Sequence, residues 1–92
     1  MKILVVDDNI NDREIMFELL NADGYEVTCA SNGVEALEKI RESKPDLVIS
    51  DIMMPQMDGF GLCRELKRTM ETIKIPIILY SSSFTGHNPK IQ

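Results

Sequence analysis

The sequence is short of positive charge and of cysteine, and each shortage excludes a class of protein. Lys and Arg number 10 against 15 Asp and Glu, which gives a formal net charge of -5. This acidity argues against non-specific nucleic-acid binding, because such binding requires clustered basic side chains. The only cysteines, Cys29 and Cys63, form no C-x-x-C pair and lack metal-ligand spacing. They are expected to be small buried residues in a reducing compartment.

The sequence also lacks a long apolar run and has one histidine. No apolar segment is long enough to span a bilayer. The first six residues lack the apolar region and cleavage site of a signal peptide, so we predict a cytoplasmic location. The histidine, His87, lies in a polar stretch, where solvent exposure is expected rather than catalysis or metal binding.

The chain alternates short apolar runs with segments of helical period. Its 92 residues fit one small domain. Strands are expected at residues 2–6, 25–30, 46–50 and 75–80. Between them, apolar residues expected to face inward on three helices are Ile15, Met16, Leu19 and Leu20, then Val34, Leu37 and Ile40, then Phe60, Cys63, Leu66 and Met70. This alternation predicts an α/β fold with a parallel sheet and helices on both faces.

Acidic residues follow two of the predicted strands. Asp7 and Asp8 end the first strand, Asp51 ends the third, and Ser81 follows the fourth. In an open parallel sheet the carboxyl ends of the strands gather at one edge, where function collects. Carboxylates brought close together raise each other's pKa unless a cation neutralises them, and oxygen ligands favour Mg²⁺. Asp7 or Asp8 alone is better explained by a turn or a helix cap. Asp51 at the end of an apolar strand is less easily explained in that way, but one Asp is a weak signal, so the prediction depends on the three together with the hydroxyl of Ser81.

A loop is expected at residues 54–59, and its residues are explained by ordinary structural roles. Gly59 is expected to be a turn or helix-start glycine with Asp58 as its N-cap. Pro55 is expected to stiffen the loop. The methionines are expected to fill gaps in the core, namely Met53, Met54 and Met57.

Three stretches together resemble the response-regulator receiver domain of two-component signalling. They are V-V-D-D-N at 5–9, A-S-N-G-V-E-A-L at 30–37 and P-D-L-V-I-S-D-I-M-M-P-Q-M-D-G at 45–59. The third is highly specific, since the Asp, the Met-Pro and the Asp-Gly all fall in register. The resemblance implies a flavodoxin-like, doubly wound parallel sheet of order 2-1-3-4-5. Residues 80–85 are similar to receivers of hybrid or PAS-linked histidine kinases.

The resemblance also implies roles for individual residues. Asp51 matches the phosphoacceptor and Ser81 the hydroxyl residue that hydrogen-bonds the phosphoryl group. Asp7 and Asp8 match the acidic pair that, with Asp51, holds Mg²⁺ or Mn²⁺. The remaining matches are the metal-binding backbone carbonyl of Met53, the site-shaping Pro55 and Gly59, and the small residue Ser82.

The sequence departs from the family pattern after Ser81. Only 11 residues follow, whereas a strand–helix–strand unit needs about 30 residues. We therefore expect a truncated receiver over residues 1–83, with the fourth helix, fifth strand and fifth helix missing and a loop or tail at 84–92. Lys90 lacks a preceding apolar strand and is not assigned the role of the family's fifth-strand lysine. The fourth strand would then be an apolar edge, which predicts self-association through that strand or the open helix face.

Two functions follow from these residues. The first is a phosphoacceptor domain that takes a phosphoryl group from a histidine kinase onto Asp51, catalysing its own modification without being a conventional turnover enzyme. The alternative is a truncated, non-catalytic module for protein interaction or dimerisation. A haloacid-dehalogenase-type phosphatase is discounted, because it needs an Asp two residues after the nucleophile, where this chain has Met53.

Overall fold

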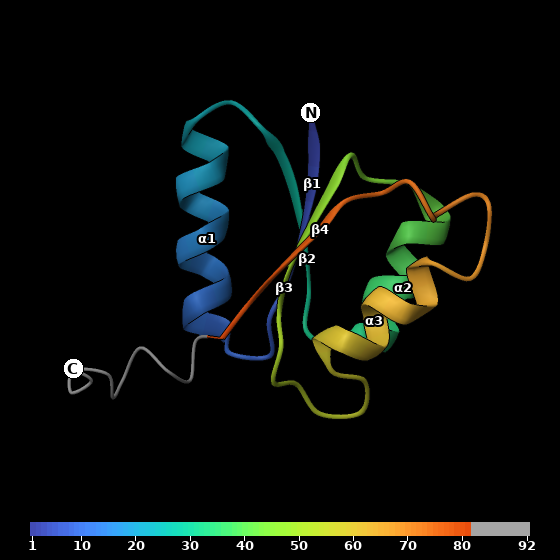
Figure 1. Ribbon diagram of the computed structural model, residues 1–92. Coiled ribbons are helices and arrows are strands. Elements are labelled where there is room, and N and C mark those ends of the chain that lie inside the picture. The colour runs from blue at the N-terminus through green and yellow to red at the C-terminus, as the bar shows by residue number, and fades with distance from the viewer. Residues whose placement is uncertain (82–92) are drawn as a thin grey trace, which may run out of the picture.

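A computed structural model describes residues 1–81 as a sheet of parallel strands with helices on both faces (Figure 1). Along the chain the elements are β1 (Lys2–Val6), α1 (Ile10–Ala22), β2 (Glu26–Ala30), α2 (Gly33–Glu42), β3 (Leu47–Asp51), α3 (Gly59–Leu66) and β4 (Ile77–Tyr80). The sheet order is β2-β1-β3-β4. The predicted flavodoxin-like arrangement is confirmed. Residues 1–81 contain neither a fifth strand nor further α-helices, and residues 82–92, including Ser82 and Lys90, lie outside the described part.

Short polar segments set the start of each helix. The side chains of Asn9, Asn32 and Asp58 each accept a hydrogen bond from the backbone three residues on, which caps α1, α2 and α3. Gly24 follows α1 in the left-handed region, with φ of 94°. The helix boundaries therefore agree with local signals in the sequence.

The core lies between the sheet and the pair α2 and α3. Its buried residues come from the sheet and from both of these helices: Leu4, Val6, Ala30, Ala36, Ile40, Val48, Leu62 and Leu66. The expected inward positions Val34, Phe60 and Met70 are wrong, because all three side chains are exposed. Ile40 and Leu66 are buried as predicted, and each shares its buried stripe with a residue one helical turn earlier, Ala36 in α2 and Leu62 in α3. Met70 lies beyond the end of α3.

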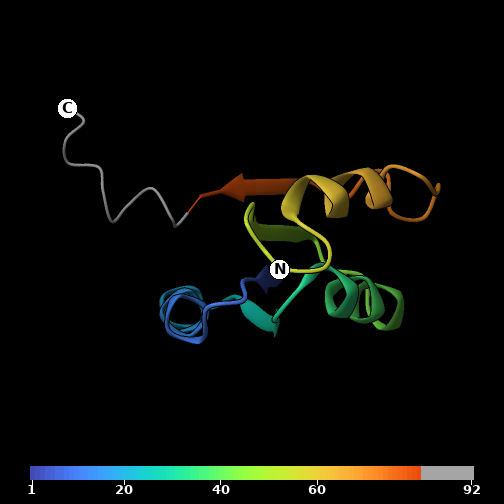
Figure 2. The same cartoon turned by 90° about the horizontal axis from the view of Figure 1, so that it is seen from below.

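The opposite face of the sheet is covered only in part. Figure 2 shows α1 alone on this side, beside β1 and β2, with α2 and α3 on the other. No residue of α1 is buried. The expectation that Ile15 and Leu19 face inward is wrong, since they are 59% and 64% exposed, while Met16 and Leu20 are half-buried. The reason is that α1 packs against one part of the sheet only, so a single narrow stripe of it is covered.

Strand β4 forms an edge of the sheet built by residues 1–81, as predicted. Ile78 in its middle is 52% exposed.

Cys29 and Cys63 are free thiols and only half-buried, so the expectation of full burial is wrong. Among the helices that the structure describes, none has the length and hydropathy that crossing a membrane requires.

Candidate functional site

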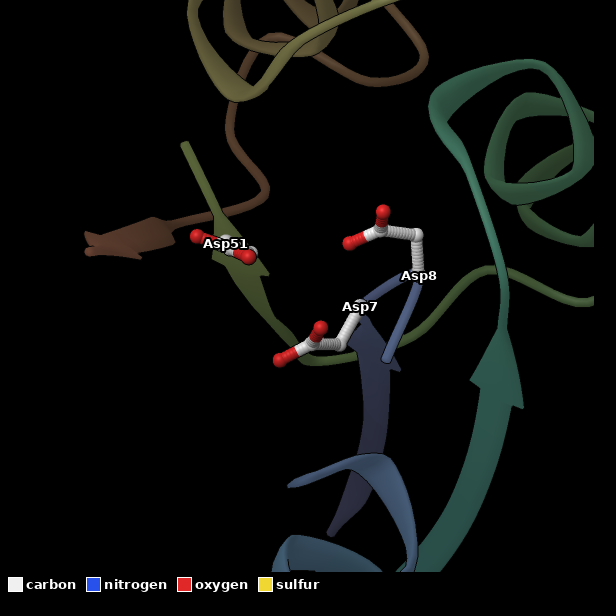
Figure 3. A group of neighbouring side chains, drawn as sticks. All are labelled: Asp7, Asp8 and Asp51. Carbon is white, nitrogen blue, oxygen red and sulfur yellow. The ribbon is translucent and has the colours of Figure 1, made fainter. Parts of the chain in front are cut away.

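Three carboxylates meet at the carboxyl edge of the sheet (Figure 3). One oxygen from each of Asp7, Asp8 and Asp51 lies within 4.8 Å of the others. The register explains this meeting: Val6 of β1 is the partner of Ser50 of β3, so the next residues, Asp7 and Asp51, are neighbours. Asp7 is 0% and Asp51 3% exposed, whereas Asp8 faces solvent.

The side chain of Asp7 is held from two directions. Its Oδ1 accepts a hydrogen bond from the backbone N–H of Asn9 at 2.9 Å, and its Oδ2 accepts one from the hydroxyl of Tyr80. The backbone carbonyl of Asp7 accepts a bond of 2.7 Å from Arg13 Nη1 at the start of α1. Donors from α1 and β4 therefore fix the end of β1.

Asp51 is placed by the end of β3 and the loop behind it. Its Oδ1 accepts a hydrogen bond from Met53 N at 3.3 Å. The next residue, Ile52, donates its N–H to the carbonyl of Tyr80 at 2.8 Å and accepts from the N–H of Gly59 at 2.9 Å. The loop thus returns against the strand end before α3 begins.

Gly59 has a stricter role than the turn glycine expected from the sequence. A Cβ at this position would lie 2.6 Å from the backbone oxygen of Asp51 and 3.0 Å from Ile52 Cα. The first contact is closer than the two atoms can approach, and the second is tighter than an ordinary van der Waals contact. Only glycine lets α3 start this near the candidate phosphoacceptor.

The other loop residues divide between core and surface. Met54 and Met57 pack against the core as expected, but the expectation for Met53 is wrong, because this residue is 62% exposed. Pro55 lies exposed in the loop. Met53 contributes to the site through its backbone, because its N–H donates a hydrogen bond to the carboxylate of Asp51.

Ser81 lies at the same edge as the carboxylates. Tyr80 is the register partner of Asp51, so Ser81 continues β4 by one residue beyond that pair and is half-buried. Ser82, expected to leave room beside it, lies outside the described residues.

Tyr80 is the site residue that the sequence alone did not indicate. Burial raises the pKa of its hydroxyl, and the hydrogen bond to Asp7 and the charges of Asp7 and Asp51 raise it further. The phenol is therefore protonated and acts as a donor. A terminal strand tyrosine was a weak signal, because its partner is 73 residues away in sequence.

The donor set fits a hard divalent cation. Three carboxylate oxygens in a small space, two of them on buried residues, carry negative charge that burial makes costly to leave uncompensated. Mg²⁺ is bound in proteins by a few carboxylates together with water. The cluster therefore suits Mg²⁺ or Mn²⁺ better than a softer metal that prefers nitrogen or sulfur.

Comparison with known sequences agrees with this geometry. The family described as the response regulator receiver domain matches residues 3–89. Similar proteins include "Probable transcriptional regulator ycf27" of Pyropia yezoensis, 47% identical over 81 residues, and "Response regulator MprA" of Mycobacterium avium, 42% identical over 78 residues. These alignments cover 88% and 85% of this chain but 32% and 34% of the relatives. The chain thus spans about a third of the length of the curated relatives it matches.

Solved structures show the same fold. The N-terminal domain of a response regulator receiver protein from Methanoculleus marisnigri has a TM-score of 0.82 at 37% identity, covering 85% of this chain and 63% of that one. Chemotaxis response regulator CheY4 of Vibrio cholerae gives 0.81 at 37%, with 85% and 65% covered. The receiver domain of a signal transduction histidine kinase from Syntrophus aciditrophicus gives 0.82 at 41%, with 85% and 59% covered.

Proposed function

Because this chain belongs to the response regulator receiver domain family, we propose that Asp51 is the residue on which it accepts a phosphoryl group from a histidine kinase. Receiver domains serve as phosphoacceptors in two-component signalling and are not conventional turnover enzymes. The observation that carries the assignment to Asp51 is its position. It is a buried carboxylate at the end of β3, within reach of Asp7 and Asp8.

The chemistry is nucleophilic displacement at phosphorus. An oxygen of the Asp51 carboxylate forms a bond to phosphorus as the P–N bond of phosphohistidine breaks, and the electron pair of that bond stays with the histidine nitrogen. Asp7, Asp8, Asp51 and the backbone carbonyl of Met53 would hold Mg²⁺ or Mn²⁺. The cation, when bound, supplies positive charge that offsets the charge of the transferring group.

The remaining residues orient the group once it is attached. The Ser81 hydroxyl donates a hydrogen bond to a phosphoryl oxygen, and Ser82 leaves space beside it. Pro55 and Gly59 shape the loop that keeps Asp51 at the edge of the sheet. This division of roles rests on the match of each residue to the family motif and on the common edge that Asp51 and Ser81 share.

Intact mass after incubation with acetyl phosphate and Mg²⁺ tests the assignment. The wild type should gain a phosphoryl adduct, and Asp51→Asn should gain none. Asp58→Asn is the matched control, because it changes another loop carboxylate while asparagine still caps α3. It should be modified like the wild type. Equal adducts on wild type and Asp51→Asn, or none on a folded wild type, would contradict the proposal.

The interaction-module alternative rests on a separate observation, the apolar residues exposed on α1 and β4. These include Ile15, Leu19 and Ile78. Their exposure beside an edge strand favours self-association. Sedimentation velocity over a range of concentrations tests this, and Ile78→Lys should shift the protein toward monomer. A wild type that stays monomeric at the highest concentration would contradict the alternative.

A further inference from the structure

Tyr80 links two strands that are not neighbours. β3 lies between β4 and β1, so the donor and acceptor are rooted on strands about 10 Å apart. The hydroxyl of Tyr80 nevertheless reaches Asp7 Oδ2. It does so at the level of Asp51, the register partner of Tyr80 on the intervening strand.

This bond completes the fixation of the Asp7 carboxylate. Both carboxylate oxygens accept a hydrogen bond, Oδ1 from the N–H of Asn9 and Oδ2 from the hydroxyl of Tyr80. Rotation about the Cβ–Cγ bond would lose both hydrogen bonds. Each oxygen retains a lone pair, so a cation can still bind a carboxylate held in this way.

We propose that Tyr80 is a positioning residue for the cation: its hydroxyl holds the Asp7 carboxylate in the orientation that faces Asp8 and Asp51. The inference rests on the proposed function, in which Asp7 is a metal ligand. Hydrogen-bond partners of metal ligands fix ligand orientation, and their loss costs about tenfold to a hundredfold in metal affinity. Tyr80 therefore contributes to Mg²⁺ affinity without touching the ion.

A purely structural role predicts something different. Tyr80 also ties β4 to β1, and deleting a donor from a buried carboxylate destabilises the fold. Such a role would lower stability in the absence of metal but leave the Mg²⁺ affinity of the folded protein unchanged. Affinity and stability must therefore be measured separately.

The first experiment compares Tyr80→Phe with Tyr25→Phe. Tyr25 is the chain's other tyrosine and directly precedes β2, at the opposite edge of the parallel sheet. Isothermal titration with Mg²⁺ on unphosphorylated protein should give equal dissociation constants for wild type and Tyr25→Phe, and one about tenfold higher or more for Tyr80→Phe. Thermal unfolding in EDTA gives the stability of each variant. A destabilised Tyr80→Phe with wild-type affinity overturns the proposal.

A second measurement does not require Tyr80→Phe to fold. In Tyr25→Phe, Tyr80 is the only tyrosine, so tyrosine difference absorption reports on it alone. Mg²⁺ should change this absorption with the same dissociation constant that calorimetry gives. Binding with no change at Tyr80 overturns the inference but leaves the proposed function standing. A wild type that binds no Mg²⁺ overturns both.

Discussion

Replacing Gly59 with alanine should destabilise the protein and displace its candidate phosphoacceptor. The new Cβ would lie 2.6 Å from the carbonyl oxygen of Asp51. Since carbon–oxygen contacts begin near 3.3 Å, the two backbones must separate by roughly 0.7 Å. The Leu79 side chain, whose Cδ2 would lie 2.9 Å away, could rotate, but the third close atom, Ile52 Cα at 3.0 Å, is also backbone, and the N–H of Gly59 donates to the carbonyl of Ile52.

The magnitude follows from two opposing effects. Overpacking of this kind costs about 1–3 kcal/mol. Replacing glycine by alanine in a helix returns at most about 1 kcal/mol, and less at the first helical position. We therefore expect a net loss of about 1–2 kcal/mol, which lowers the urea midpoint by on the order of 1 M for a protein of this size. Formation of the phosphoryl adduct on Asp51 should fall as well.

Urea unfolding followed by far-UV circular dichroism measures the change. Gly61→Ala is the matched control in the same helix, because its Cβ would meet chiefly the flexible side chain of Met57, at 3.1 Å. It should lie within about 0.5 kcal/mol of wild type. If Gly59→Ala unfolds at the wild-type midpoint with an unchanged slope, the steric reasoning is refuted. Equal losses in both variants would point to the helix and not to Asp51.

Three further predictions concern the core, a cap and pH. Leu62→Ala should lower the free energy of unfolding by about 2–5 kcal/mol, whereas Phe60→Ala, two residues away but exposed, should lower it by less than about 1 kcal/mol in the same urea experiment. A larger loss for Phe60→Ala would contradict the buried face assigned to α3. Asn9→Ala should cost about 0.5–2 kcal/mol, read from thermal unfolding, because it removes the side-chain cap of α1. The backbone N–H and the hydroxyl of Ser31 donate to Glu35 and lower its pKa. This contribution to stability is present above the unfolded pKa of about 4.3 and is lost as pH falls through the lower folded value. The stability difference between wild type and Glu35→Gln should therefore shrink below pH 4, and a difference that grows on acidification would contradict it.

The sequence predicted most of the secondary structure because local chemistry decides it. The apolar runs that end at Asp7 and Asp51 form buried strands, and Asp58 is the N-cap of α3, as predicted. The carboxylate cluster was also predictable, since parallel strands bring their carboxyl ends to one edge. Its proximity needed only the strand order that the family resemblance implied.

The buried faces of the helices were predicted less well. The helical period of the apolar residues shows that one face of the helix is buried. It does not show which of several neighbouring apolar residues lie on that face. In the packed structure Leu62 and Ala36 are buried, whereas Phe60 and Val34 are exposed. For α1, the limited cover on its side of the sheet left Ile15 and Leu19 exposed.

What the sequence determined by itself is the order of strands and helices, the cap at Asp58 and the set of acidic residues at the strand ends. These depend on neighbours within a few positions and on general rules for parallel sheets. Only the tertiary structure decided that Tyr80 holds Asp7 and that Gly59 must lack a side chain beside Asp51. Both depend on the distance between segments far apart in sequence, which strand register and packing fix and no local pattern encodes.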